Sequence, residues 1–327
     1  MALVDACDVV LLDLDGTVWS GGTALPNAVE TIDGLDVPAV YITNNAYRGP
    51  GEVAELLHGL GIRAEPGDVL TSAQAALSMA REHIEPGAKL LVLGSESFRS
   101  LAREAGYEVV ASAEDEPRAV LHGHSPDTGW RELSEAALAI QRGADYFASN
   151  LDTSLPTERG LLVGNGSMVA AVTSATGVTP KAAGKPEAAM YIQATRTAGA
   201  SRPLAVGDRL DTDIAGAVAA RIPSLHVLTG VSGPLALLEA PKEQRPTFIG
   251  EDLSALRMDA AELAPGPQGG FTARVDKGDL ILGRGTADAT PVQALRTALQ
   301  VAWHMPEPPA LVRPDSDAAE KACAEWW

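Results

Sequence analysis

Short apolar runs, each followed by a polar turn, are the feature of this sequence that most constrains its fold. Three of them end directly before a residue that can carry chemistry: Val9–Leu12 before Asp13, Ala39–Ile42 before Thr43, and Leu204–Val206 before Gly207-Asp208. A continuous apolar run is typical of a strand buried on both faces, as in a parallel sheet covered by helices. Helical patterns lie between the runs, at Asn27–Leu35 and Gly51–Leu60. The alternation predicts an α/β fold with a doubly wound parallel sheet.

Such folds place their sites just beyond the carboxyl ends of the strands. Asp13, Thr43 and Asp208 all occupy that position, so we expect them to belong to one site. Asp13 and Asp15 lie two residues apart, and a turn beginning at Gly16 can rotate the second carboxylate away from the first. Asp13 can then act as a nucleophile and Asp15 as the general acid and base. For this motif alone, a solvated pair of strand-end aspartates is the alternative.

The chain resembles the haloacid dehalogenase (HAD) superfamily in four motifs, which follow in that family's order. The sequence DLDGT at 13–17 resembles the first motif, and Thr43 resembles the hydroxyl of the second. Lys185, between Gly184 and Pro186, resembles the cation of the third motif. The run GDRLDTD at 207–213 resembles the fourth, and the resemblance extends to about residue 250. It implies a HAD-like core for this part of the chain.

The resemblance also implies roles for these residues in a Mg²⁺-dependent phosphatase that forms an aspartyl-phosphate on Asp13. Asp13 and Asp208 would supply carboxylate oxygens to Mg²⁺ and Asp15 its backbone carbonyl, which suits a cation that prefers oxygen ligands. Asp213 would support the metal shell from behind; an ordinary aspartate at a helix N-terminus is its alternative. The residues that would bind the substrate phosphate are Thr43, Asn44, Asn45 and Lys185. A merely solvated lysine is the alternative for Lys185.

Position 15 separates the reaction classes of the family. The dehalogenases lack an acid there, since a halide leaves without protonation, and the ATPase branch resembles DKTGT. Asp15 can instead activate water against the aspartyl-phosphate, so hydrolysis of a phosphoric monoester is favoured.

A second α/β unit is predicted within the first, with strands at Lys89–Leu93, Ala119–Leu121 and Tyr146–Ala148. Its place between Thr43 and Lys185 resembles a type IIA cap, as in the NagD-like and phosphoglycolate–glycerol 3-phosphate phosphatase group. The predicted division is a catalytic core at 1–77 and 181–252, a cap domain at 78–180 that sets substrate specificity, and a C-terminal appendage at 253–327.

The candidate specificity loop of the cap is Asp152–Arg159, in which Asp152, Leu155 and Arg159 are the candidate residues. Asp152 as a turn former and Arg159 as an exposed arginine are the alternatives. Pyridoxal phosphatases carry histidine where Leu155 stands, which argues against that substrate. Glycerol 3-phosphate is the preferred substrate, and 2-phosphoglycolate, nucleoside monophosphates and sugar phosphates are the alternatives. His122 and His124 are interpreted as packing or surface residues, because they lack metal-ligand partners at suitable spacing.

The net charge of −18 argues against nucleic acid as a partner, because a phosphate backbone needs a basic patch. A small phosphomonoester must therefore be attracted locally, by a metal, a lysine or backbone N–H groups. Two distant cysteines favour a reducing cytoplasm. No apolar run reaches the length of a membrane span, and no signal-peptide pattern precedes the first run. Family precedent suggests a homodimer through the cap.

The last segment is predicted to form a small α+β appendage, with a hairpin (Phe271–Val275, Asp279–Leu282) and a helix near Pro291–Trp303. It faintly resembles part of an acetyltransferase-like fold but is too short to complete one. We expect a structural role, by packing on the core or in oligomerisation, with Trp303, Trp326 and Trp327 as packing or interface residues. Two alternatives remain for the whole chain: a phospho-ligand sensor that has lost turnover, and a phosphotransferase that uses a sugar acceptor.

Overall fold

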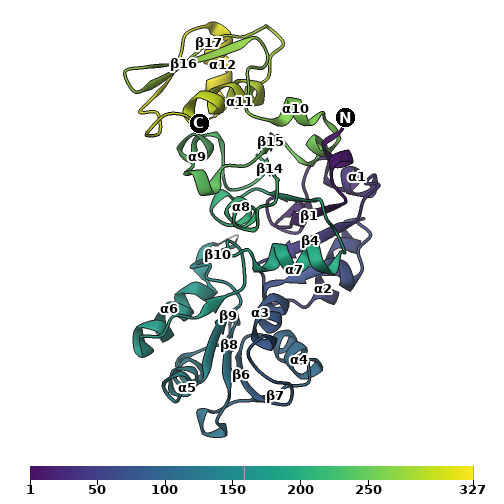
Figure 1. Cartoon of the computed structure of the whole chain (residues 1–327), viewed down its shortest axis with the longest axis vertical. Helices are drawn as coiled ribbons and strands as arrows, with labels where there is room; N and C mark the ends of the chain where they lie inside the picture. Colours follow the sequence, from purple (N-terminus) through teal and green to yellow (C-terminus); the bar gives the residue numbers. More distant parts are fainter. Residues whose placement is uncertain (158, 327) are drawn as a thin grey trace. The chain divides into compact units, whose positions relative to one another are not determined.

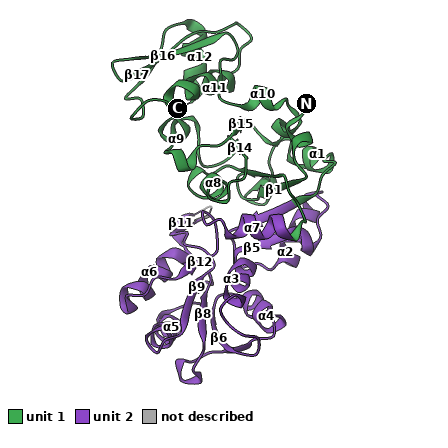
Figure 2. Cartoon of the chain, in the orientation of Figure 1, with its two compact units in different colours: residues 1–39, 197–327 green, residues 40–196 purple. Residues whose placement is uncertain are grey.

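The computed structural model describes residues 1–157 and 159–326 of the chain. The chain forms two compact units, residues 1–39 with 197–327 and residues 40–196 (Figure 2). Within the described ranges, no helix combines the length and apolar character that crossing a membrane requires.

The first unit contains four parallel strands in the order β15-β14-β13-β1 (Figure 1). Their bounds are Phe248–Gly250, Ser224–Val227, Pro203–Gly207 and Val9–Asp13. Every residue of β1 is buried, and Leu11 lies opposite Ala205 on β13. The continuous apolar runs therefore form two-sided buried parallel strands, as predicted. β1 and β13 run in the same direction, so Asp13 and Asp208 lie at the same edge of the sheet.

The other elements of this unit up to residue 263 are short. They are η1 (Leu3–Ala6), β2 (Trp19–Ser20), β3 (Thr23–Ala24), α1 (Ala28–Asp33), η4 (Leu210–Ile214), α8 (Ala215–Ala220), α9 (Pro234–Glu239), η5 (Lys242–Gln244), η6 (Leu253–Arg257) and α10 (Ala260–Leu263). η4 is a turn of π-helix that leads from β13 into α8.

The second unit contains a parallel five-stranded sheet in the order β12-β9-β8-β6-β7. These strands are Lys181–Ala182, Asp145–Ala148, Ala119–His122, Lys89–Leu93 and Glu108–Val110. Leu91, Val120 and Tyr146 face α5 (Trp130–Gln141) and α6 (Asn165–Thr176) in one apolar cluster. Figure 1 shows α3 (Ser72–Arg81) and α4 (Glu96–Glu104) on the other side of this sheet. Helices on both faces make this a second doubly wound unit, and its three predicted strands are confirmed.

A further parallel pair in this unit joins β4 (Ala39–Thr43) and β5 (Val69–Thr71). The remaining elements are α2 (Pro50–Gly59), η2 (Pro66–Asp68), η3 (Ala113–Asp115), the antiparallel hairpin of β10 (Ser154–Thr157) and β11 (Gly160–Val163), and α7 (Ala189–Thr197). The predicted helix at 51–60 and the predicted strand at 39–42 are both present, and β4 extends one residue further, to Thr43.

The C-terminal segment forms a mixed sheet, in which β17 (Asp279–Arg284) pairs antiparallel with β16 (Phe271–Asp276) and parallel with β18 (Val312–Pro314). Two helices, α11 (Pro291–Ala302) and α12 (Asp317–Ala324), complete it. Its apolar residues share one core cluster with Leu237 and Ile249 of α9 and β15, and Trp326 is buried in that cluster. The predicted hairpin and helix are confirmed, and the segment packs on the rest of its unit. Trp327 lies outside the described residues.

Two arginines connect this segment to the rest of its unit through hydrogen bonds to backbone carbonyls. Arg296 on α11 is 2% exposed, and its guanidinium donates to the carbonyl of Ile249 from Nε at 2.8 Å and from Nη2 at 2.5 Å. Burial lowers the pKa of this guanidinium to about 10. At the C-terminal end of α11, the carbonyl of Trp303 accepts a hydrogen bond from Arg245 at 2.7 Å. The indole of Trp303 donates to the carbonyl of Leu237 at 2.8 Å. These bonds hold α11 against β15 and α9.

Arg296→Ala should lower the free energy of unfolding by about 2–4 kcal/mol, because it leaves a cavity and a buried carbonyl without its donors. Denaturant unfolding measures the loss. Arg274→Ala is the control: its side chain is 62% exposed and its ion pair with Asp315 is 3.7 Å long, so we expect a change below about 0.5 kcal/mol. An equal loss of unfolding free energy in both variants would contradict a stabilising role for Arg296.

His122 is a fully buried histidine in the sheet of the second unit. Its exposure is 0%, and Nδ1 lies 2.9 Å from the hydroxyl of Tyr146. Burial lowers the pKa of His122 from 6.5 to about 4, since a charged imidazole is costly in an apolar cluster. The expectation that this histidine is a packing residue is therefore met by its surroundings.

The low pKa of His122 makes the free energy of unfolding depend on pH in the acidic range. Between pH 6.5 and pH 4 the unfolded chain binds a proton that the folded chain excludes, so stability falls as pH is lowered through this window. His122→Leu should reduce the loss in unfolding free energy between pH 7 and pH 5 by about 1–2 kcal/mol. Chemical denaturation at both pH values measures it. The exposed His304, changed to Leu, should leave the loss unaltered, and a wild-type pH dependence in His122→Leu would refute the assignment.

Candidate active site

Three buried aspartates converge at the carboxyl edge of the sheet in the first unit. Asp13, Asp208 and Asp213 are 9%, 0% and 2% exposed, and one carboxylate oxygen of each lies within 4.8 Å of the others. Carboxylates this close repel one another strongly when removed from water. Oxygen-only donors in a compact group suit a hard divalent cation such as Mg²⁺. The residues present therefore fit the predicted metal centre.

Asp208 is held by hydrogen bonds and by two glycines. Its Oδ2 accepts the N–H of Val231 at 2.7 Å, and its Oδ1 accepts the hydroxyl of Thr17 at 3.4 Å. A Cβ at Gly16 would lie 2.6 Å from Cγ of Asp208, and one at Gly230 would lie 2.0 Å from its Oδ2. Gly16 also has a φ of 92°, which favours glycine. Only glycine at both places leaves the carboxylate room to stand in the cluster.

Asp213 reaches the cluster from η4. Its Oδ2 accepts the N–H of Arg209 at 3.0 Å. A Cβ added at Gly207 would lie 2.3 Å from the Cβ of Asp213, so only glycine fits there. Asp213 thus combines the two interpretations that the sequence left open: it accepts a backbone N–H at the start of a helical turn, and its carboxylate lies beside those of Asp13 and Asp208.

Asp15 has a different environment from these aspartates. It is exposed, and its Oδ1 accepts the indole N–H of Trp19 at 2.8 Å. The carbonyl of Gly16 accepts the hydroxyl of Thr229 at 2.6 Å, which ties this turn to the end of β14. An accessible carboxylate beside a buried one suits two separate roles in one reaction.

In the second unit, Lys185 is buried and fixed. It is 3% exposed, and its Nζ donates to the carbonyl of Ile42 at 3.4 Å. The alternative of a solvated lysine is therefore wrong. Asn44 holds the backbone of this residue on both sides, because its Oδ1 accepts the Lys185 N–H at 2.8 Å and its Nδ2 donates to the Lys185 carbonyl at 3.0 Å. A buried ammonium needs such support, since its desolvation is costly.

Thr43 and Asn45 form the turn that ends β4. Thr43 is 3% exposed, and its hydroxyl accepts the N–H of Asn45 at 3.0 Å. The side-chain carbonyl of Asn45 accepts the N–H of Tyr47 at 2.8 Å. The structure thus brings Thr43, Asn44 and Lys185 together in this unit, and Asp13, Asp208 and Asp213 in the other.

Of the three candidate cap residues, Leu155 and Arg159 lie in the β10–β11 hairpin, and Asp152 lies just before it. Asp152 is half-buried and accepts from Nδ2 of Asn44 at 3.1 Å, so the side chain has a partner in the turn after β4. Leu155 on β10 is 39% exposed, and Arg159 is exposed in the turn between β10 and β11. Glu158, within the same predicted loop, lies outside the described residues.

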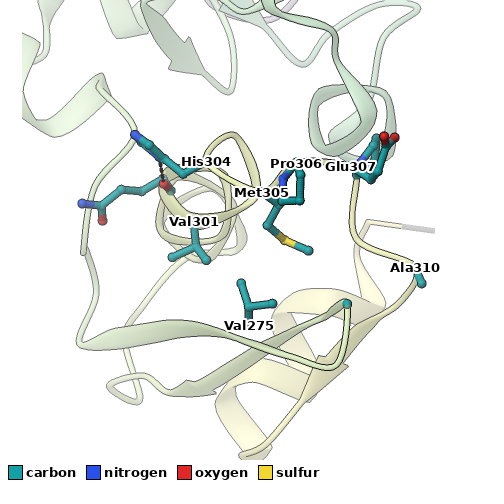
Figure 3. A pocket seen from close by; sticks show the side chains of 10 residues that line it. Val275, Val301, His304, Met305, Pro306, Glu307 and Ala310 are labelled. Carbon is teal, nitrogen blue, oxygen red and sulfur yellow. Dashed lines mark hydrogen bonds between the residues drawn. The ribbon is translucent and has the colours of Figure 1, made fainter.

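A cavity of about 800 Å³ lies in the C-terminal segment (Figure 3). Val275 of β16 and Val301 of α11 face each other across it, and Met305 points into it. His304 at its rim donates from Nδ1 to the carbonyl of Gln300 at 2.7 Å. None of the predicted site residues lines this cavity, so it is separate from the aspartate cluster.

Comparisons with known proteins agree with this geometry. A family model described as haloacid dehalogenase-like hydrolase matches residues 10–108, and one described as HAD-hydrolase-like matches residues 182–256. The D-glycerol 3-phosphate phosphatase of Mycobacterium tuberculosis is 46% identical over 271 residues, which cover 83% of this chain and 77% of that protein. The acid sugar phosphatase of Staphylococcus aureus is 37% identical over 251 residues, covering 75% of this chain and 94% of that protein.

A solved structure extends the similarity to the whole chain. The crystal structure of the glycerol phosphate phosphatase from Mycobacterium tuberculosis in complex with magnesium has a TM-score of 0.95 and 40% identity. It covers 100% of this chain, and this chain covers 98% of it. The C-terminal segment is therefore shared with that structure.

The chain belongs to the haloacid dehalogenase-like hydrolases. Within them it is a member of the type IIA (NagD-like) group, and it is a phosphatase of small phosphoric monoesters with Mg²⁺ as its metal.

Sequence reasoning missed some of the residues that hold these side chains. The amide of Val231 and the hydroxyl of Thr229 follow β14, and only the fold brings them to Asp208 and Gly16. A signal was present for Trp19, since a tryptophan four residues after Asp15, across a glycine turn, can return to that carboxylate.

Gly230→Ala should weaken Mg²⁺ binding by at least about tenfold, because its methyl group would displace the carboxylate of Asp208. Isothermal titration with Mg²⁺, without substrate, measures this. Gly233→Ala is a matched control in the same loop, where a Cβ meets nothing within 4 Å. Unchanged Mg²⁺ affinity in Gly230→Ala would show that the position of Asp208 does not determine metal binding.

Proposed function

We propose that this protein hydrolyses glycerol 3-phosphate to glycerol and inorganic phosphate. The observation that carries the proposal is its 46% identity with a D-glycerol 3-phosphate phosphatase over 83% of this chain. The leucine at position 155 supports it, because the pyridoxal phosphatases, which act on another phosphate ester, have a histidine there.

Asp13 is the nucleophile in this proposal. Its carboxylate attacks phosphorus, the bond from phosphorus to the glycerol oxygen breaks, and an aspartyl-phosphate forms on Asp13. Asp15 gives its proton to the departing oxygen and then takes a proton from the water that attacks the aspartyl-phosphate. Phosphate leaves, and both carboxylates return to their first state. The exposure of Asp15 supports its role, since it must exchange protons with substrate and water.

Positive charge and hydrogen-bond donors are needed to overcome the net charge of −18. We assign phosphate binding to Thr43, Asn44, Asn45 and Lys185. The burial of Lys185 supports an electrostatic role, because a fixed ammonium in a low-dielectric surrounding interacts strongly with a phosphoryl group. The side chains of Asn44 and Asn45 hold the surrounding turn, which favours their backbone N–H groups as the donors.

Asp13, Asp208 and the carbonyl of Asp15 are assigned as Mg²⁺ ligands, with Asp213 supporting them. Bound Mg²⁺ supplies the positive charge that allows a phosphate dianion to approach a carboxylate nucleophile. The proximity of the Asp13, Asp208 and Asp213 carboxylates supports this assignment.

Specificity and organisation complete the proposal. Residues 1–77 and 181–252 act as the catalytic core, 78–180 as the cap and 253–327 as an appendage, with Asp152, Leu155 and Arg159 selecting the alcohol part of the substrate. A homodimer through the cap is supported by its exposed apolar hairpin, where Leu161 is 73% and Val163 60% exposed. Cys7 and Cys323 are free and buried, which supports a cytoplasmic location, and the acidic charge disfavours nucleic acid as a partner.

Phosphate release from a panel of monoesters, with and without Mg²⁺, tests this function. The panel contains glycerol 3-phosphate, 2-phosphoglycolate, a nucleoside monophosphate and a sugar phosphate. We expect the highest kcat/KM for glycerol 3-phosphate, and a loss of at least about 10³-fold in Asp13→Asn. Asp127→Asn, at an exposed position of the other unit, should retain full activity.

Other outcomes of this panel would replace the proposal. A higher kcat/KM for another monoester changes the substrate and leaves the mechanism standing. Binding of glycerol 3-phosphate without phosphate release indicates a sensor. Phosphate transfer to an added sugar in preference to water indicates a phosphotransferase.

A further inference from the structure

Among the tryptophans in the described part of the chain, Trp19 is the one whose indole N–H donates to a residue of the proposed chemistry. Its Nε1 donates to Oδ1 of Asp15 at 2.8 Å. The indole is 6% exposed, whereas Asp15 is exposed. A buried ring therefore carries a hydrogen bond to an accessible carboxylate.

The backbone around Trp19 fixes the direction of this bond. The N–H of Gly16 donates to the carbonyl of Trp19 at 2.8 Å, and the N–H of Trp19 donates to the carbonyl of Leu14 at 3.0 Å. Trp19 also pairs with Ala24 in the β2–β3 hairpin. Because the turn is closed at both ends, the backbone of Trp19 is held in place, and the burial of the ring leaves the indole little room to rotate.

An indole N–H is a donor only and does not titrate. Oδ1 of Asp15 accepts the hydrogen bond from the Trp19 indole. A proton on Oδ1 therefore cannot point in the direction from which the indole N–H donates. This hydrogen bond distinguishes the two carboxylate oxygens of Asp15. Oδ2 does not accept the Trp19 N–H, so Oδ2 can carry the proton that is transferred. A general acid acts only when its proton is aimed at the leaving oxygen.

We propose that Trp19 is a positioning residue for catalysis: its indole N–H holds Oδ1 of Asp15, so that Oδ2 delivers the proton to the leaving alcohol. This inference rests on the general acid role proposed above for Asp15. Trp19 acts through Asp15 and does not itself touch the substrate.

The test compares leaving groups. Glycerol leaves as a basic alkoxide and needs the proton, whereas 4-nitrophenolate is a stable anion that departs without one. Since kcat/KM covers the steps up to departure of the leaving group, a misdirected acid affects it most for glycerol 3-phosphate. In Trp19→Phe we expect kcat/KM to fall about 10–100-fold for glycerol 3-phosphate and less than about threefold for 4-nitrophenyl phosphate, with Mg²⁺ affinity unchanged.

Trp303→Phe is the matched control. It removes an indole N–H that also donates to an oxygen at 2.8 Å, the carbonyl of Leu237, in the C-terminal segment. Both substrates should keep their wild-type kcat/KM in this variant. A similar loss on both substrates in Trp19→Phe would mean general structural damage and would overturn the positioning role.

Asp15→Asn separates the inference from the proposal that it rests on. Wild-type hydrolysis of glycerol 3-phosphate in Asp15→Asn would refute the role of Asp15 itself. Loss of that activity, together with a Trp19→Phe variant that shows no leaving-group dependence, would refute only the role of Trp19.

If Trp19→Phe does not fold, the hydrogen bond can be tested with the tryptophan in place. The indole N–H signals of the five tryptophans are recorded by NMR for wild type and for Asp15→Ala, which alters an exposed residue. We expect one signal to move upfield when the carboxylate is removed. A spectrum in which no indole signal moves would show that the bond is absent in solution, and the inference would fail.

Discussion

The repulsion among three buried carboxylates is the constraint on which this structure depends. Asp13, Asp208 and Asp213 lie so close together, and so far from water, that they demand a compensating cation. Their arrangement is possible because β1 and β13 are adjacent parallel strands that end at the same edge. The surrounding backbone supplies N–H donors from Val231 and Arg209. Metal binding and the stability of this edge are therefore linked, since the cation relieves a repulsion that the fold creates.

The two carboxylates of the DxD motif lie in different surroundings, which suits the separate functions that we propose for them. Asp13 is buried at a strand end, where a nucleophile is shielded from water. Asp15 is exposed after a sharp turn at Gly16, where an acid can exchange its proton. The indole of Trp19 gives Asp15 a fixed partner that burial does not provide. A turn of a few residues thus gives one residue type two different environments, as the two proposed roles require.

The C-terminal segment shows how an addition can become part of a core. Its apolar residues merge with those of α9 and β15, and Arg296 and Arg245 satisfy carbonyls across the junction. The match over 98% of the mycobacterial glycerol phosphate phosphatase structure indicates that the fold of this segment is not peculiar to one chain. The segment has its own cavity, which none of the predicted site residues lines.

The sequence by itself determined the strands, because continuous apolar runs such as Val9–Leu12 are typical of strands buried on both faces of a sheet, and its motifs singled out Asp13, Asp15, Lys185 and Asp208 as candidate site residues. It also predicted the hairpin and helix after residue 270. Only the tertiary structure decided which distant groups hold these side chains: Gly230 and Val231 around Asp208, Asn44 at Lys185, and Ile249 beneath Arg296. The physical reason is that a motif specifies a side chain, whereas burial, steric limits and hydrogen-bond partners arise from chain segments that meet only when the sheet has formed.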